Sequence, residues 1–88
     1  MGKYVYTVHA EEKLKSQEAR KLRITKKRIQ RIVEKPIAID ASEKTVMIAI
    51  GKLSRTLSLA VVYKKVGDAI RIITFYPAEK GRYERKIL

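Results

Sequence analysis

The apolar residues of this chain change their spacing at Pro36. Before it, Ile29, Ile32 and Val33 recur at the three-and-four spacing that lines one face of a helix. Pro36 ends that helix, because proline has no N–H to donate and disfavours helical geometry at the residue before it. After Pro36 the apolar residues alternate with others in short runs typical of strands. The change of period predicts an α+β domain, with helices packed on one face of an antiparallel sheet.

The expected arrangement is two N-terminal helices packed on an antiparallel sheet of three to four strands, in the order β-α-α-β-β-β. Thr7 and Thr25 each stand where an N-cap hydroxyl is expected. Gly67 suits a tight hairpin turn, and Pro77 is expected to end the last strand. The helices are expected over Val8–Lys21 and from Thr25 to Pro36, and the strands over Tyr4–Val8, Ile37–Ala41, Thr45–Lys52, Leu57–Lys65 and Ile70–Tyr76.

The size and composition limit the classes of protein to consider. Eighty-eight residues allow one domain, residues 1–88, and an apolar content of 45% excludes an intrinsically disordered chain. There is no cysteine and one histidine, so neither a disulfide framework nor a thiolate or His-rich metal site is expected, and no cofactor is predicted. The chain has neither a signal-peptide layout nor an apolar run near the roughly 18 residues of a membrane helix, so a cytoplasmic location is expected.

The positive charge is the strongest functional indication. The formal net charge is +12, and Arg20–Lys35 alone holds eight basic residues and one acidic. A cation-rich stripe attracts polyanions and releases counterions when it binds them. The expected outward positions of the second helix are Lys26, Lys27, Arg28 and Arg31. Nucleic acid, an acidic protein partner and a merely solvated basic surface are all compatible with this pattern.

Arg71 stands inside the apolar strand Ile70–Tyr76. Period-two alternation predicts that it points to the same side as Ile73 and Phe75. A guanidinium in such surroundings must find a carboxylate, a phosphate or the rim of the sheet. Two interpretations stay open: a phosphate clamp on the sheet, or an arginine that faces solvent or pairs with Asp68.

The C-terminal segment Tyr76–Lys86 mixes cations with aromatic rings around Gly81. Cations track phosphates while rings stack on bases, so the mixture suits single-stranded nucleic acid. It also suits phosphodiester chemistry, because Arg or Lys can stabilise charge on phosphoryl oxygens while Tyr, Glu or His moves protons. The lone histidine, His9, is a further acid–base candidate, with a packing role as the alternative.

Short motifs follow one another along the chain in a fixed order. They are Val8-His9-Ala10-Glu11-Glu12, Ile24-Thr25-Lys26-Lys27, Glu34-Lys35-Pro36, Val61-Val62-Tyr63, Ile70-Arg-Ile-Ile-Thr-Phe-Tyr-Pro-Ala78 and Gly81-Arg-Tyr-Glu-Arg-Lys86. In this order the chain resembles a family of small RelE-like domains. It also resembles, more distantly, the BrnT ribonuclease toxins, whose last strand carries Arg-Ile-Ile-Ser and is followed by a Glu-Arg pair. The resemblance covers nearly the whole chain and implies a RelE/ParE-type fold.

The resemblance also implies roles for single residues. Arg71 matches the strand arginine, Glu84 and Arg85 match the closing pair, and His9 matches the histidine that opens the first helix. The chain departs from the toxin pattern at positions 75–76, where Phe-Tyr stands in place of Ala-Arg, so a second arginine is missing. Some relatives in the superfamily inhibit gyrase instead of cutting RNA.

The function expected from these features is metal-independent RNA cleavage by the toxin of a toxin–antitoxin pair. Arg71 and Arg85 would stabilise the scissile phosphate, and Tyr83, Glu84 and His9 are the candidate proton-transfer groups. The expected nucleic-acid-binding residues are Lys27, Arg28, Arg31, Tyr76, Lys80, Arg82 and Lys86. The expected partners are RNA, with ribosome-bound mRNA among the options, and an acidic antitoxin, and no membrane is expected. The alternatives are a non-catalytic RNA- or DNA-binding module and a scaffold whose basic face holds an acidic antitoxin.

Overall fold

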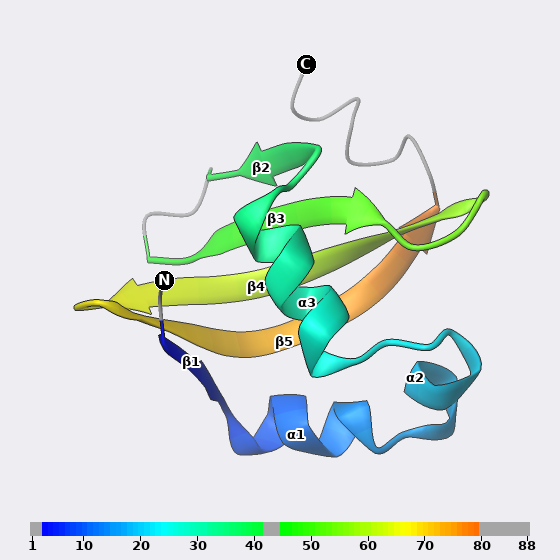
Figure 1. Ribbon diagram of the computed structural model, residues 1–88, viewed down its shortest axis with the longest axis horizontal. Coiled ribbons are helices and arrows are strands. Elements are labelled where there is room, and N and C mark those ends of the chain that lie inside the picture. The colour runs from blue at the N-terminus through cyan, green and yellow to red at the C-terminus, as the bar shows by residue number, and fades with distance from the viewer. Residues whose placement is uncertain (1–2, 42–44, 80–88) are drawn as a thin grey trace.

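A five-stranded sheet and three helices make up the part of the chain that the structure describes, residues 3–41 and 45–79 (Figure 1). In this computed structural model the sheet order is β1-β5-β4-β3-β2. None of the helices in these ranges is both long and apolar enough to cross a membrane. The elements are β1 (Lys3–Tyr6), α1 (Val8–Leu14), α2 (Gln17–Lys21), α3 (Lys26–Glu34), β2 (Ala38–Asp40), β3 (Met47–Lys52), β4 (Leu57–Val66) and β5 (Ala69–Glu79).

The segment expected to form one helix over Val8–Lys21 forms two, so that prediction is wrong. Ser16 takes an extended backbone between them and caps α2. Its hydroxyl accepts a hydrogen bond from the amide of Ala19 at 3.2 Å and donates one to the carbonyl of Lys13 at 2.6 Å. Serine interrupts a helix readily at such a position, because its side chain satisfies amides that the helix would leave open.

The sheet is larger than expected and is not wholly antiparallel. β1 pairs with β5 in parallel, with Val5 opposite Arg71, whereas the other neighbouring strands are antiparallel. The expectation of three to four antiparallel strands therefore needs correction to five strands in a mixed sheet. Lys3 and Ala69 are partners across β1 and β5, and no local pattern joins segments so far apart in sequence.

β5 departs from simple alternation near its middle. Its register with β4 shifts between Val62 and Tyr63, which leaves Ile73 as an extra residue in a β-bulge. Beyond the bulge Phe75 points into the core and is buried, whereas Arg71 is exposed on the opposite face. The prediction that Arg71 and Phe75 share a side is therefore wrong, because it assumed an unbroken period of two.

β5 also continues past Pro77 to Glu79, so the prediction that Pro77 ends it is wrong. Pro77 lies opposite Leu59 of β4. β1 borders β5 only over Ala69–Ile72, so Pro77 lies where β5 forms the edge of the described sheet. Proline is tolerated on a strand edge, because its missing N–H then removes no hydrogen bond from the interior of the sheet.

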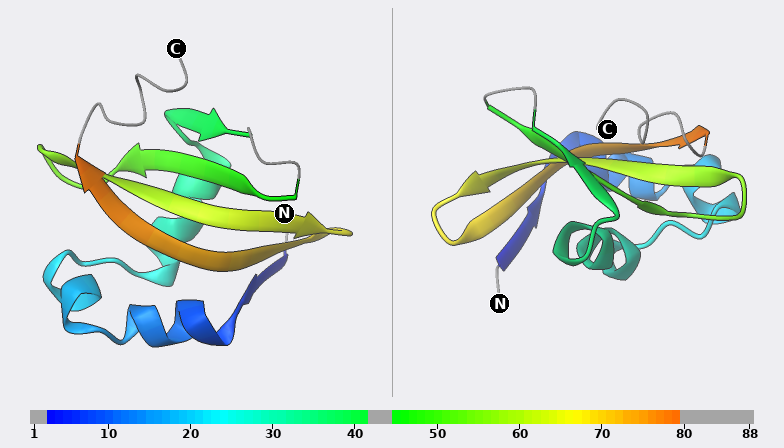
Figure 2. Two further views of the ribbon diagram at one scale, coloured as in Figure 1. Left: turned by 180° about the vertical axis from the view of Figure 1, so that it is seen from behind. Right: turned by 90° about the horizontal axis from the view of Figure 1, so that it is seen from above.

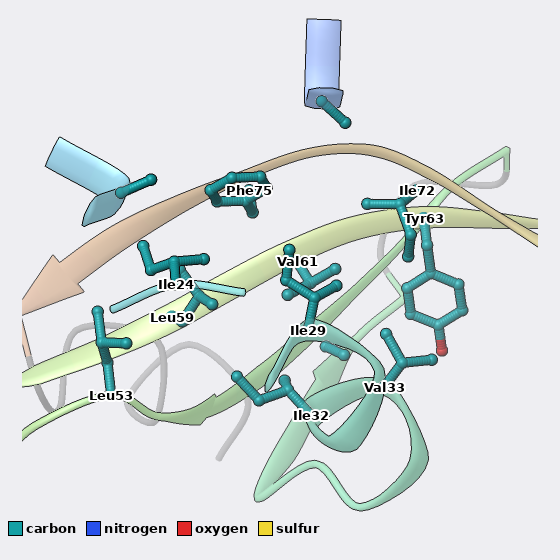
Figure 3. Packing of buried hydrophobic residues seen from close by; sticks show 13 residues of the cluster. Ile24, Ile29, Ile32, Val33, Leu53, Leu59, Val61, Tyr63, Ile72 and Phe75 are labelled. Atoms are coloured by element: carbon teal, nitrogen blue, oxygen red, sulfur yellow. The ribbon is translucent and has the colours of Figure 1, made fainter. Parts of the chain in front are cut away.

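The core lies between α3 and one face of the sheet (Figure 2). Ile29, Ile32 and Val33 of α3 are buried against this face, which confirms the prediction from their spacing. Figure 3 shows them opposite Leu59 and Val61 of β4. α1 contacts β5 instead, along the edge that β1 leaves free (Figure 1).

α3 lies close to β3 at Gly51. A Cβ built at this position would lie 2.6 Å from Cγ1 and 2.9 Å from Cγ2 of Ile32. Real Cβ atoms do not come so close to other carbon atoms, so the missing side chain is what admits α3 at this depth. This contact sets how α3 presents its outer side chains.

Candidate nucleic-acid interface

Five basic side chains from three parts of the fold line one open pocket beside α3. α3 contributes Lys27, Arg28 and Arg31, the turn before it contributes Arg23, and the end of β3 contributes Lys52. Among the residues that the structure describes, the lining contains no acidic side chain. The pocket therefore concentrates positive charge in a concave surface, where the local field is strongest.

The capping and packing of α3 direct its cations outward. The hydroxyl of Thr25 accepts a hydrogen bond from the amide of Arg28 at 3.2 Å, which starts the helix as predicted. With Ile29 and the other apolar residues facing the sheet, Lys27 and Arg31 lie on the exposed side. Both were predicted as nucleic-acid-binding residues.

Arg28 differs from its neighbours, because it is half-buried and its guanidinium has protein partners. It donates to the carbonyl of Leu53 at 2.8 Å and to the carbonyl of Arg23 at 3.4 Å. These bonds tie the start of α3 to the segment after β3. A guanidinium has five N–H donors, so Arg28 can hold the wall of the pocket in place through these two bonds and still donate to a ligand.

The basic surface continues along α3 from this pocket. Lys27 and Arg31 also line a second hollow, together with Gln30, Glu34 and Lys35. On the β1 side Lys26 is already engaged, since its Nζ lies 3.0 Å from Glu11 Oε2 and 4.8 Å from the centre of the Tyr6 ring. We call the cations around α3 the α3 basic face: Arg23, Lys27, Arg28, Arg31, Lys35 and Lys52.

Arg23 and Lys52 are members of this face that sequence reasoning missed. Arg23 belongs to the basic segment Arg20–Lys35, so its charge was visible in the sequence although its place was not. Lys52 is an ordinary lysine at the end of a strand. Only the packing of β3 beneath α3 brings it beside Arg23, and no local signal could have found it.

Arg71 lies on the face of the sheet opposite α3, directly across from Lys64 of β4. Both side chains are exposed, and side chains at such directly opposed positions have Cβ atoms about 4.5–5.5 Å apart. In the described part of the chain Arg71 forms no ion pair, so the alternative pairing with Asp68 is not formed. Two like charges therefore stand side by side.

The other predicted catalytic residues are not gathered around Arg71 in the described part of the chain. His9 is exposed on α1, and the hollow beside Arg71 is lined instead by residues such as Val5, Thr7 and Val66. Tyr76 is half-buried further along β5, with its ring centre 6.0 Å from the Nζ of Lys13. Six predicted residues lie outside the described ranges: Lys80, Arg82, Tyr83, Glu84, Arg85 and Lys86.

Two tyrosines of β1 hold α3 from its other side. Tyr4 donates to Oε2 of Glu34 at 3.2 Å, and burial together with this carboxylate raises the pKa of Tyr4 to about 12. Tyr6 accepts a hydrogen bond from Gln30 at 3.1 Å, and burial raises its pKa as well. Both hydroxyls thus link β1 to α3 through hydrogen bonds.

No group of three or more His, Cys, Asp or Glu residues within 3–41 and 45–79 is placed to hold a metal ion. The chain matches no known family model, no curated protein and no solved structure. The charge and geometry of the α3 basic face and of Arg71 are what indicate a function.

Proposed function

We propose that the domain binds RNA through the α3 basic face. The observation that carries this proposal is the convergence of five cations from three elements on one pocket without an acidic side chain in its described lining. The cations of such a cluster repel one another, and nucleic-acid phosphates are neutralised by clustered Lys and Arg with release of counterions. RNA is favoured over DNA by the resemblance of the sequence motifs to RelE-like domains.

The salt dependence of binding tests this proposal. For a single-stranded RNA the slope of log affinity against log salt is about −0.7 per phosphate neutralised. The double variant Lys27→Ala, Arg31→Ala should flatten the slope by about 1.4. A matched control is Lys15→Ala, Lys65→Ala, which removes the same charge from exposed positions at the C-cap of α1 and on β4. A wild-type slope near zero would reject RNA binding and favour an acidic antitoxin as the ligand of this face.

Metal-independent RNA cleavage is the second candidate, and the Lys64–Arg71 pair favours it. Two opposed cations without an acidic partner among the described residues could hold one phosphate between them. In such a reaction the ribose 2′-hydroxyl attacks the adjacent phosphorus, and the 5′-oxygen leaves with a proton. The products then end in a 2′,3′-cyclic phosphate. Arg85 is proposed to share the charge, and His9, Tyr83 and Glu84 are the proposed proton-transfer groups.

Cleavage assays with purified variants separate this candidate from binding alone. Arg71→Ala should lower the rate by about 10²–10³, because one preorganised donor to the transition state is lost. Arg71→Lys should recover only part of it, since an ammonium lacks the bidentate fork. Lys65→Ala is the matched control from the neighbouring position of β4. Full activity of the double variant Arg71→Ala, Arg85→Ala, or loss of cleavage on adding a chelator, would contradict the mechanism.

A further inference from the structure

We propose that the pocket between α3 and the end of β3 is a discrete site for a single phosphate group, and that Arg23 is retained there for binding at the expense of folding. The inference rests on the proposed RNA binding and makes it specific: one phosphate of the strand docks in the pocket, while the remaining contacts are diffuse. The ligand chemistry is a phosphate oxyanion, whether an internal phosphodiester or a terminal phosphate.

Arg23 lies in the turn that ends α2. α2 ends in a Schellman turn, in which the amide of Ile24 donates to the carbonyl of Ala19 at 2.8 Å and the amide of Arg23 donates to the carbonyl of Arg20 at 3.2 Å. In such a turn the residue after the C-cap adopts the left-handed conformation. Here the C-cap is Leu22, and the residue after it, Arg23, has φ 57°. Glycine is the usual residue there, because any Cβ is strained in that conformation.

Arg23 therefore opposes the local fold. Among the described residues, Gly67, with φ 62°, is the other position with a positive φ, and it carries the residue that the conformation favours. A strained non-glycine residue persists where the surrounding structure holds its conformation, and such residues cluster at functional sites. Arg23 lines the basic pocket, so binding there is the role that an arginine at this position indicates.

The charges of the pocket also favour a bound anion. Within the described chain Arg23, Lys27, Arg31 and Lys52 form no ion pair. Arg23 and Arg31 each supply a planar fork that matches phosphate oxygens bidentately, and the two lysines supply further charge. The Arg23 carbonyl also accepts from Arg28 at 3.4 Å, so the strained turn itself helps to fix the wall of the pocket.

The decisive variant is Arg23→Gly, for which stability and binding should move in opposite directions. Relief of the left-handed strain and of charge repulsion should raise the midpoint of thermal unfolding by about 4–8 °C. Loss of a charged donor should weaken phosphate and RNA binding about tenfold. Arg23→Asn, which also tolerates this conformation, provides a second variant with the same expectation. Arg20→Gln removes one charge from exposed α2 and is the control that leaves binding near the wild-type value.

Two probes report on the site and on the function separately. Inorganic phosphate is titrated at constant ionic strength, with the amide NMR shifts of Thr25 and Lys27 as the readout for the pocket. A single-stranded RNA with and without a 5′-phosphate is titrated by fluorescence anisotropy, and its two forms distinguish a terminal phosphate from an internal one.

The outcomes distinguish the two proposals. A more stable Arg23→Gly protein that binds phosphate about tenfold more weakly supports the inference. A less stable Arg23→Gly protein, or one that binds phosphate as well as wild type, overturns it. Phosphate binding without RNA binding rejects the proposed function and keeps the site. The site is rejected and the proposed function kept if RNA binding depends on salt and has the same affinity in Arg23→Gly, while phosphate causes no shift of the amide NMR signals.

Discussion

Tyr4 and Tyr6 show how single hydroxyls fix the surface that carries the charge. They reach from the edge strand β1 to the carboxylate of Glu34 and to the amide of Gln30, both on α3. The sequence suggested a stacking role for Tyr76 and a proton-transfer role for Tyr83, but placed Tyr4 only within the first strand. The sequence gives no sign of these links, because they join residues 24 to 30 positions apart.

The pH dependence of stability should reveal the Tyr4 link. Its pKa rises from 10.0 to about 12 in the folded protein, so the folded state keeps a proton that the unfolded state loses first. The stabilisation is therefore complete below pH 10 and is lost as the pH rises towards about 12. In urea unfolding between these pH values, Tyr4→Phe should show a shallower loss of stability than wild type. Equal pH profiles for the two proteins would contradict the link.

The helices and strands that the sequence predicted well are those with local causes. α3 forms as expected because Thr25 caps it, Pro36 follows it, and its apolar spacing matches one face of a helix. β5 was predicted less well, since the bulge at Ile73 and the passage through Pro77 depend on its neighbours β4 and β1. The parallel pairing of β1 was missed altogether for the same reason. Local chemistry thus determines where elements begin, and packing determines how they continue.

The contact of α3 with β3 should make the free energy of unfolding sensitive to side-chain size at Gly51 and Ile32. Gly51→Ala should lower the free energy of unfolding by about 1–3 kcal/mol, because the new methyl overlaps the β-branched Ile32. Ile32→Ala alone should also destabilise, by about 2–5 kcal/mol. In the double variant the new methyl gains room. Its loss of stability in urea unfolding should therefore be clearly smaller than the sum of the losses in the two single variants. Additive effects, or a stabilised Gly51→Ala protein, would show that the close approach does not govern the position of α3.

For the molecule as a whole, the excess of positive charge was visible in the sequence, but the placement of the cations on the two faces of the sheet was not. The basic segment Arg20–Lys35 predicted a cationic helix face correctly at Lys27 and Arg31. The pocket also needs Lys52, which arrives from another element, and Arg71 stands on the opposite face because of the bulge. Two separate cationic surfaces on opposite faces of the sheet are thus a property of the fold. Their separation allows binding and chemistry to be tested with different variants.

The net charge of +12 should make the stability of the fold depend on salt. The radius of gyration is 12.3 Å, close to the Debye length of about 10 Å at 0.1 M salt, so at lower salt each cation in the described ranges is repelled by most of the others there. Raising sodium chloride from about 0.02 M to about 0.5 M should therefore raise the unfolding temperature while it weakens RNA binding.

Phosphate at equal ionic strength should raise the unfolding temperature further than chloride, because a ligand that binds only the folded state stabilises it by mass action. Phosphate also stabilises proteins generally by exclusion from their surface. Arg23→Gly measures that general effect, so the excess of phosphate over chloride should shrink in this variant. Thermal unfolding followed by circular dichroism checks both expectations. A wild-type unfolding temperature that does not rise with chloride would mean that the cations are too far apart to repel one another appreciably. An equal phosphate excess in both proteins would mean that the excess reflects solvent exclusion and not occupation of the pocket.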